Sequence, residues 1–362
     1  MTIALRNLAL KNRIRTACSA FAMLAAAVLA GAPSAAADLH QTVTQAQKKI
    51  VKLYGAGGLR GLEAWQTGLL ISDDGYILTV WSYVLDADRI TAVLDDGRRF
   101  DARLVGADPS LEVAVLKIEG ENLPAFDLAK AVAVEPGTRV VALSNAFGVA
   151  QGNEPATAQA GVVTAVTHLA ARRGVFETPY RGPVYVVDAV TNNPGAAGGA
   201  IINYRGQLAA MIGKELKNSL NNTWLNYAVP ISELRKSVEE IRAGKFVTRQ
   251  PSETEKKPAQ AHTLAGLGLL LVPDVLERTP PFVDHVQEQS PAARAGVQPD
   301  DLIVLVGDRL IQSIKNLHSE LEYIDHEDPV KLTVIRGHEL VEIVISPGNR
   351  GKIGRASCRE RV

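Results

Sequence analysis

The stretch Asn192-Asn193-Pro194-Gly195-Ala196-Ala197-Gly198-Gly199 decides how the rest of the chain is read. Three glycines and two alanines form a turn here, and the apolar run Ala200-Ile201-Ile202 follows directly. A glycine-dense turn that leads into a buried strand allows the backbone to aim its own N–H groups into a cleft. At the centre of this turn, where such a site would carry a nucleophile, the residue is Ala197.

Composition limits the function classes. The 362 residues suffice for two or three domains. Basic and acidic residues are equally numerous, 39 each, so the chain has no net positive electrostatic field that would favour binding to nucleic acid. The two cysteines, Cys18 and Cys358, lie near the ends of the chain, which argues against disulfides, thiolate catalysis and cysteine-based metal sites. The sequence shows no metal-ligand cluster and no nucleotide-binding loop, so we expect no cofactor and no bound metal.

Both ends of the chain differ in composition from the middle. Residues 1–37 combine basic positions, a short apolar run and small residues before Asp38, which predicts a signal peptide and export to a periplasm or beyond. An uncleaved membrane anchor is the alternative, although the apolar run is shorter than the ~20 residues needed to span a bilayer. Residues 349–362 form a tail. From Ile353 onward it back-translates to a common sequencing adapter, so we expect an artefact there, the alternative being an ordinary basic tail.

The region from Val51 to Pro230 alternates short strands with Gly and Asp turns, which predicts a mostly β fold of sandwich or barrel type. The run Val113–Ile118 is continuously apolar, so its strand should be buried. After Pro230 the pattern becomes helical, with Ser232 as the expected N-cap and Gly244 as the stop.

A polar, proline-containing segment then separates this region from a smaller unit. The predicted division is a first domain over 38–245, a linker over 246–262 and a second domain over 263–348. The second domain should contain strands, two helices and a terminal hairpin around Arg336-Gly337-His338.

Several motifs resemble those of the HtrA (DegP-like) serine proteases, in the family's order and over nearly all of Leu53 to Ile345. They are Thr67-Gly68 to Thr79, Asp108-Pro109-Ser110-Leu111-Glu112-Val113-Ala114-Val115-Leu116-Lys117-Ile118, Ser144-Asn145-Ala146-Phe147-Gly148, the turn Asn193 to Gly199, Gly266-Leu267-Gly268-Leu269, Ser290 to Gly296 and Asp300-Asp301-Leu302-Ile303. The resemblance implies a trypsin-like double β-barrel followed by a small α+β PDZ domain.

All three catalytic positions depart from the family's pattern. The resemblance places Ser82 where the family has the histidine base, Glu112 where it has the orienting aspartate, and Ala197 where it has the serine nucleophile. Acyl transfer requires an activated nucleophile, a base and a group that orients the base. We therefore expect no catalytic residues of the family type, and we predict that Ser82 Oγ donates a hydrogen bond to Glu112.

Two stretches of backbone are candidate binding sites. The amides of Gly195, Ala196 and Ala197 are candidate donors of an oxyanion type; the alternative is a relaxed loop whose amides face water or the protein. The resemblance to PDZ domains implies that Gly266-Leu267-Gly268-Leu269 holds a chain-terminal carboxylate while a peptide adds an edge strand.

The sequence thus favours an exported pseudoprotease that binds peptides, protein C-termini or unfolded chains as a scaffold, chaperone-like factor or modulator of an active protease. One alternative is an active serine endopeptidase of protein quality control with a non-standard catalytic site, for instance one that uses Ser82. Another is a structural envelope component that binds no peptide. Homo-oligomerisation stays open, because the segment Asp38–Tyr54 offers only Tyr54 as an aromatic.

Overall fold

The computed structural model describes residues 39–55, 64–85, 87, 89–173, 176–247, 257–275, 279–337 and 339–347. The predicted signal peptide, both cysteines, the tail from residue 348 and most of the predicted linker lie outside these ranges. Within them, no helix is long and apolar enough to cross a bilayer.

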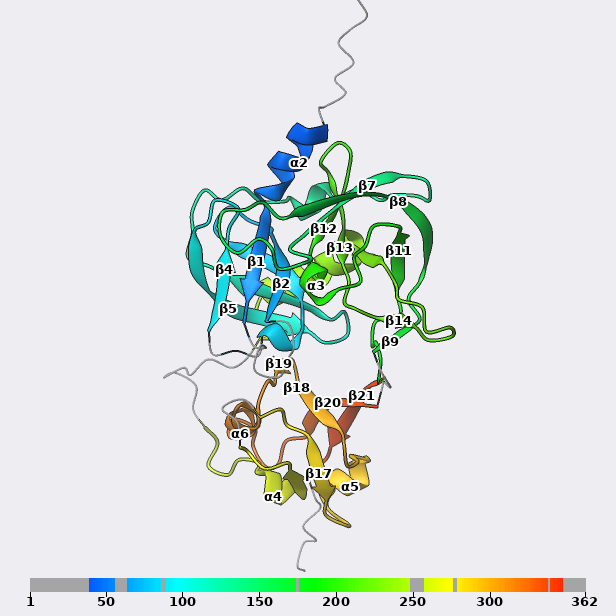
Figure 1. Ribbon diagram of the computed structural model, residues 1–362. Coiled ribbons are helices and arrows are strands. Elements are labelled where there is room, and N and C mark those ends of the chain that lie inside the picture. The colour runs from blue at the N-terminus through cyan, green and yellow to red at the C-terminus, as the bar shows by residue number, and fades with distance from the viewer. Residues whose placement is uncertain are drawn as a thin grey trace, which may run out of the picture. The chain divides into compact units, whose positions relative to one another are not determined.

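The first part of the chain forms a closed barrel of six antiparallel strands, in the order β1-β2-β3-β6-β5-β4 (Figure 1). Helix α2 (Leu39–Gln47) precedes it, and the strands are β1 (Ile50–Tyr54), β2 (Trp65–Leu70), β3 (Tyr76–Val80), β4 (Ile90–Val93), β5 (Arg99–Asp108) and β6 (Val113–Lys117). The predicted β2–β3 hairpin is confirmed, with Leu70 paired to Ile77. Its turn requires Gly75, which has a φ of 99° and whose added Cβ would lie 2.5 Å from the Ile118 carbonyl.

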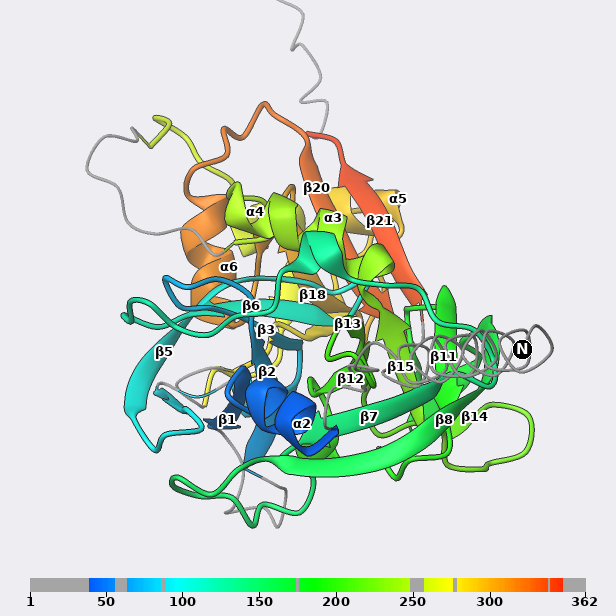
Figure 2. The same cartoon turned by 90° about the horizontal axis from the view of Figure 1, so that it is seen from above.

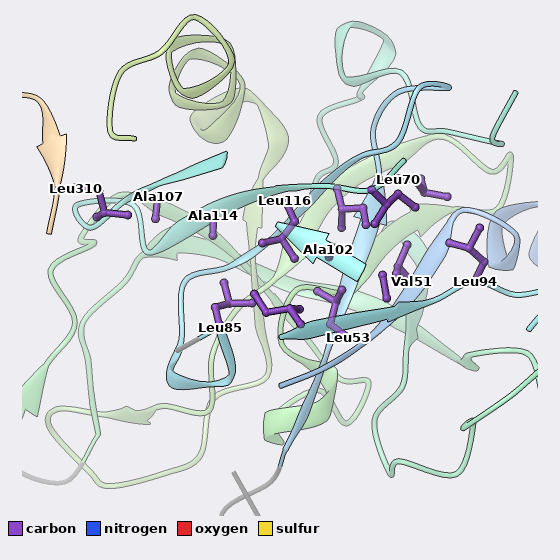
Figure 3. Close-up of a cluster of buried hydrophobic side chains, with 14 of the residues drawn as sticks. Val51, Leu53, Leu70, Leu85, Leu94, Ala102, Ala107, Ala114, Leu116 and Leu310 are labelled. Atoms are coloured by element: carbon purple, nitrogen blue, oxygen red, sulfur yellow. The ribbon is translucent and has the colours of Figure 1, made fainter. Parts of the chain in front are cut away.

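Apolar side chains from all six strands fill this barrel (Figure 3). Figure 3 shows Val51, Leu53 and Leu70 pointing into the same interior as Leu116. Strand β6 is buried over four of its five residues, as its unbroken apolar sequence predicts. The barrel therefore gives a rigid support for the loops at its ends.

A second closed barrel follows, in the order β11-β15-β13-β12-β7-β8 (Figures 1 and 2). Its strands are β7 (Arg139–Ser144), β8 (Thr157–His168), β11 (Pro183–Val187), β12 (Ala200–Asn203), β13 (Leu208–Ile212) and β15 (Tyr227–Pro230). A small sheet joins β9 (Ala171–Arg173) to β10 (Phe176–Glu177) and β14 (Lys217–Asn218). Short 3-10 helices are η1 (Tyr83–Leu85), η2 (Leu128–Lys130) and η3 (Pro194–Ala196).

Helix α3 (Ile231–Arg242) follows the second barrel, and it begins two residues earlier than predicted. Pro230 occupies the N-cap position and makes no side-chain capping bond, so Ser232 lies inside the first turn. Proline's fixed φ is compatible with a helix start, which explains how the helix begins without a polar cap. Gly244, with a φ of 97°, follows its end.

The last unit has the predicted mixture of strands and short helices. A sheet in the order β19-β18-β20-β21 and a two-stranded sheet of β16 and β17 surround one apolar cluster. The elements are α4 (Leu264–Leu267), β16 (Leu269–Leu271), β17 (Val283–Val286), α5 (Pro291–Ala295), β18 (Leu302–Val306), β19 (Arg309–Leu310), α6 (Ile314–Leu321), β20 (Val330–Arg336) and β21 (Glu339–Ile345). Asp301, which is fully buried, is fixed by Nε and Nη2 of Arg336, both at 2.8 Å.

Candidate functional site

The glycine-dense turn closes on itself. Its centre is η3, and the side chain of Asn193 accepts from the amide of Ala196 at 2.9 Å while the Pro194 carbonyl accepts from the amide of Ala197 at 3.3 Å. Two of the three amides predicted as oxyanion-type donors are thus already paired within the turn. This arrangement matches the alternative reading, in which those amides face the protein.

Close packing explains why the turn needs Gly195. An added Cβ there would lie 2.3 Å from Nε1 of Trp65 and 2.6 Å from the carbonyl of Asn145, both closer than non-bonded atoms approach. The backbone at this position is therefore wedged between a β2 side chain and the segment after β7.

Thr67 of β2 ties the turn to the first barrel. Its buried hydroxyl donates to the Gly195 carbonyl at 2.6 Å and accepts from the amide of Asn145 at 2.8 Å. Its own amide donates to the Ala197 carbonyl at 3.0 Å. Thr67 thus holds two positions of the glycine-dense turn by hydrogen bonds in a buried environment, where such bonds are costly to break.

Ser82 does not bond to Glu112, so that prediction is wrong. The Ser82 hydroxyl donates to Oε1 of Gln66 and accepts from the amide of Val84 at 3.2 Å, which starts the turn η1. The Gln66 amide nitrogen in turn donates to Oγ1 of Thr79 at 2.7 Å and to the Val80 carbonyl at 3.0 Å. Gln66 of β2 accepts from the Ser82 hydroxyl, while the carboxylate of Glu112 bonds to other partners.

Glu112 instead bonds to partners from the second half of the domain. Its Oε1 accepts from Nζ of Lys214 at 2.7 Å, and its Oε2 accepts from the hydroxyl of Thr178. The two charged side chains are 18% and 19% exposed, so water screens the pair only partly. Glu112 also has a φ of 52°, an uncommon value for a residue other than glycine.

Tyr227 packs beneath this ion pair and remains a neutral phenol. Burial, with a smaller contribution from the charge of Glu112, raises the pKa of Tyr227 well above its ordinary value. Its hydroxyl accepts from the amide of Lys214 at 3.1 Å. The tyrosine therefore offers no base near neutral pH.

A pocket of about 110 Å³ lies where these parts meet. Its walls come from Gln66, Val80, Ser82, Val84, Pro194, Ala197, Lys214 and Glu215. The fold thus brings two of the three triad-equivalent positions, Ser82 and Ala197, to one pocket. Glu112 is not part of the lining, but it bonds to Lys214, which is. The lining includes the methyl group of Ala197, the hydrogen-bonded hydroxyl of Ser82, the paired ammonium of Lys214 and the side chain of Glu215, and it includes no histidine.

Sequence reasoning missed Gln66, Thr178 and Lys214. Lys214 comes two residues after the continuously apolar strand β13. A lysine so close to a buried strand is expected to be partly buried, and a partly buried ammonium needs an acidic partner. That signal was available, but its partner is 102 residues away in sequence.

The stretch Gly266-Leu267-Gly268-Leu269 is a capped helical turn. The Thr263 hydroxyl accepts from the amide of Gly266 at 3.0 Å, and the Thr263 carbonyl accepts from that of Leu267 at 3.0 Å. Gly268, with a φ of 77°, ends the helix, and its amide donates to the Ala265 carbonyl at 3.1 Å. The amides of 266–268 are therefore paired internally, unlike those of an open carboxylate-binding nest.

Strand β16 keeps one edge without a strand partner in the described structure. It pairs with β17 only, and Leu270 is 57% exposed on it. An edge of this kind is available for an added strand. Across the described ranges, no cluster of three or more histidine, cysteine or carboxylate side chains has the geometry to hold a metal ion.

Comparisons with known proteins agree with this architecture. Residues 66–211 match the family described as "Trypsin-like peptidase domain", and residues 267–346 match the family described as "PDZ domain". A "Probable periplasmic serine endoprotease DegP-like" of Brucella suis is 30% identical over 299 residues, 80% of this chain and 54% of that protein. The protein of the same name from Chlamydia pneumoniae is 26% identical over 296 residues, 82% of this chain and 57% of that protein.

The structure titled "HtrA-type protease AlgWS227A with tripeptide" is 25% identical, with a TM-score of 0.47, and the match covers 86% of this chain and 97% of that one. The chain spans about half the length of the curated DegP-like relatives described above.

Proposed function

Because the chain belongs to the HtrA family of trypsin-like serine proteases, we propose that it is a pseudoprotease member that binds polypeptides without cleaving them. The observation that carries the proposal is the state of the pocket around Ala197. The nucleophile position bears a methyl group, and the hydroxyl of Ser82 is hydrogen-bonded to Gln66.

The magnitude of the expected loss supports this proposal. Removing either the serine or the histidine of a serine protease triad lowers turnover by roughly 10⁶, which leaves ~10³ to 10⁴ from binding and the oxyanion hole. Here the contribution of the oxyanion hole should be reduced as well, because the amides of Ala196 and Ala197 are paired within the turn. The remaining rate enhancement should therefore be small.

The alternative function, an endopeptidase that uses Ser82, would need a base that accepts the proton of the Ser82 hydroxyl. The only side chain to which the Ser82 hydroxyl donates is Gln66, whose amide does not accept a proton near neutral pH. Lys214, the cation nearest to this chemistry, is paired with Glu112. These contacts favour a structural role for Ser82.

Binding is assigned to the second domain. The match to PDZ domains and the unpaired edge of β16 support recognition of peptides, protein C-termini or unfolded chains by strand addition. A partner of this kind requires the paired amides of Gly266 and Leu267 to be released, or the carboxylate to be held elsewhere. The names of the relatives and the signal-like residues 1–37 support a periplasmic location.

Two assays on the mature chain test this proposal. We expect no cleavage of unfolded casein and no labelling by a fluorophosphonate probe, while fluorescent peptides with free C-termini bind measurably. Labelling of Ser82 would support the endopeptidase instead. Absence of peptide binding together with absence of cleavage would favour the structural alternative.

A further inference from the structure

A second groove, separate from the edge of β16, opens beside the degenerate catalytic positions. It has a volume of about 440 Å³, within the range of ligand sites. Trp81, Pro109 and Pro179 of the barrel region form one side, and Pro280, Pro281 and Phe282 form the other. The groove is mostly apolar, and its lining also includes the Glu112–Lys214 pair and Asp300.

Hydrogen bonds and a shared core hold the two sides of this groove together. The amide of Ala107 in β5 donates to the Phe246 carbonyl, and the amide of Phe246 donates to the Asp308 carbonyl, both at 2.9 Å. Leu310 of β19 joins the buried cluster of the first barrel, among Leu85 and Ala107 (Figure 3). The groove is therefore built on paired backbone and packed side chains.

One wall carries a polar atom that has no partner. Nε2 of Gln312 is buried and makes no hydrogen bond with any described residue. A buried amide N–H without an acceptor is costly, and an acceptor supplied by a bound molecule would remove that cost. An amide donor in an apolar groove fits a carbonyl oxygen of the occupant.

The four prolines of the walls exclude one mode of recognition. Proline has no backbone N–H, so these segments cannot extend a hydrogen-bonded ladder to an added strand. The carbonyl of Pro281 already accepts from the amide of Ile303 at 3.1 Å. Recognition in this groove must therefore depend on inserted side chains.

The Glu112–Lys214 pair favours a neutral occupant in the part of the groove beside it. Glu112 and Lys214 neutralise each other at 2.7 Å, and a charged occupant would have to break that pair or be desolvated beside it. We propose that this groove binds an internal segment of an unfolded polypeptide by inserting a bulky apolar side chain and pairing a backbone carbonyl with Nε2 of Gln312. The inference rests on the proposed polypeptide-binding function and adds a site that requires no chain terminus.

The test uses short peptides blocked at both ends, so that no terminal carboxylate is present. Binding to the full mature chain is followed by fluorescence anisotropy, for a peptide with one central phenylalanine and a matched peptide with serine in its place. We expect the phenylalanine peptide to bind at least tenfold more tightly.

Two variants localise the binding. Phe282→Ala, at a side chain 39% exposed in the groove wall, should weaken binding by about tenfold. Gln312→Leu should weaken it about 2- to 10-fold while the melting temperature stays equal or rises, because the variant removes an unpaired buried polar atom. Val344→Ala, at an exposed apolar residue of β21 outside the groove, is the matched control and should bind like the wild type.

The outcomes separate this inference from the proposed function. If peptides with free C-termini bind and blocked peptides do not, the groove proposal fails and the polypeptide-binding function stands. If blocked peptides bind equally well to wild type and Phe282→Ala, the groove is not their site. If neither class of peptide binds, both proposals fail.

Discussion

Nζ of Lys214 lies 2.7 Å from Oε1 of Glu112, and this ion pair joins the two β-barrels beside the pocket that contains Ala197. Glu112 precedes β6 of the first barrel, and Lys214 follows β13 of the second. The carboxylate at the position of the family's orienting acid therefore bridges the barrels. Three loops meet at it, because Thr178 bonds to its other oxygen.

Breaking this pair from one side should destabilise the barrels. Lys214→Met leaves the Glu112 carboxylate, only 18% exposed, without its cation, and we expect a loss of about 2 kcal/mol in the free energy of unfolding. Urea unfolding of the mature chain measures it. The double variant with Glu112→Gln should recover part of the loss, since both charges are then absent. Full additivity of the two changes would contradict the coupling.

Restoring the nucleophile alone should not restore hydrolysis. Ala197→Ser supplies a hydroxyl, yet Ser82 stands where a base is needed and the amides of Ala196 and Ala197 stay paired within the turn. A fluorogenic casein assay should give the same background rate for the variant and the wild type. Labelling of position 197 by a fluorophosphonate probe in the variant would show that an unidentified base is present.

Removing the hydroxyl of Thr67 should loosen the turn. Thr67→Val keeps the shape but leaves the Gly195 carbonyl and the Asn145 amide without their buried partner, at a cost of about 1–3 kcal/mol. Thr223→Val, at an exposed threonine, is the control and should change stability little. Hydrogen exchange should show faster exchange around residues 193–199 only in the first variant. Equal stability of both variants would refute the anchoring role.

A buried lysine should make stability depend on alkaline pH. Lys52 of β1 is buried with its ammonium on the carbonyls of Gly152 and Glu154, and burial lowers the pKa of Lys52 below its ordinary value of 10.5. Between the lowered pKa and 10.5 the unfolded chain keeps a proton that the folded chain has lost, so stability rises with pH there.

The variant Lys52→Met should flatten that rise, whereas Lys48→Met, at an exposed neighbour, should keep it. Urea unfolding at a series of pH values above neutrality measures the slope. An unchanged slope in Lys52→Met would assign the effect to another group, such as Lys49, whose pKa is also lowered by burial.

Local sequence signals predicted the strands and hairpins, whereas the double barrel followed from the resemblance to the family. The turn before Gly75 and the apolar run of β6 each specify a hairpin or a buried strand within a few residues. The contacts of the site, in contrast, join residues that are far apart in the sequence. Lys214 with Glu112, and Thr67 with Gly195, join residues separated by 102 and 128 positions, and no periodicity reports such pairs.

The same limit applies to the partner of Ser82. Its position in the family's order predicts Glu112, but the Glu112 carboxylate bonds to Lys214 and Thr178, and Gln66 of β2 accepts from the Ser82 hydroxyl instead. For the stretch 266–269 the glycine pattern allows an open nest or a helical turn, and the capping hydroxyl of Thr263 selects the turn.

The closed turn at residues 193–197 also limits what redesign of this site could achieve. Peptide hydrolysis of the family's type would need a serine, a base and an orienting acid at three separate positions, together with the opening of amides that Asn193 and Pro194 now occupy. A designer would therefore have to rebuild the backbone of the turn as well as three side chains.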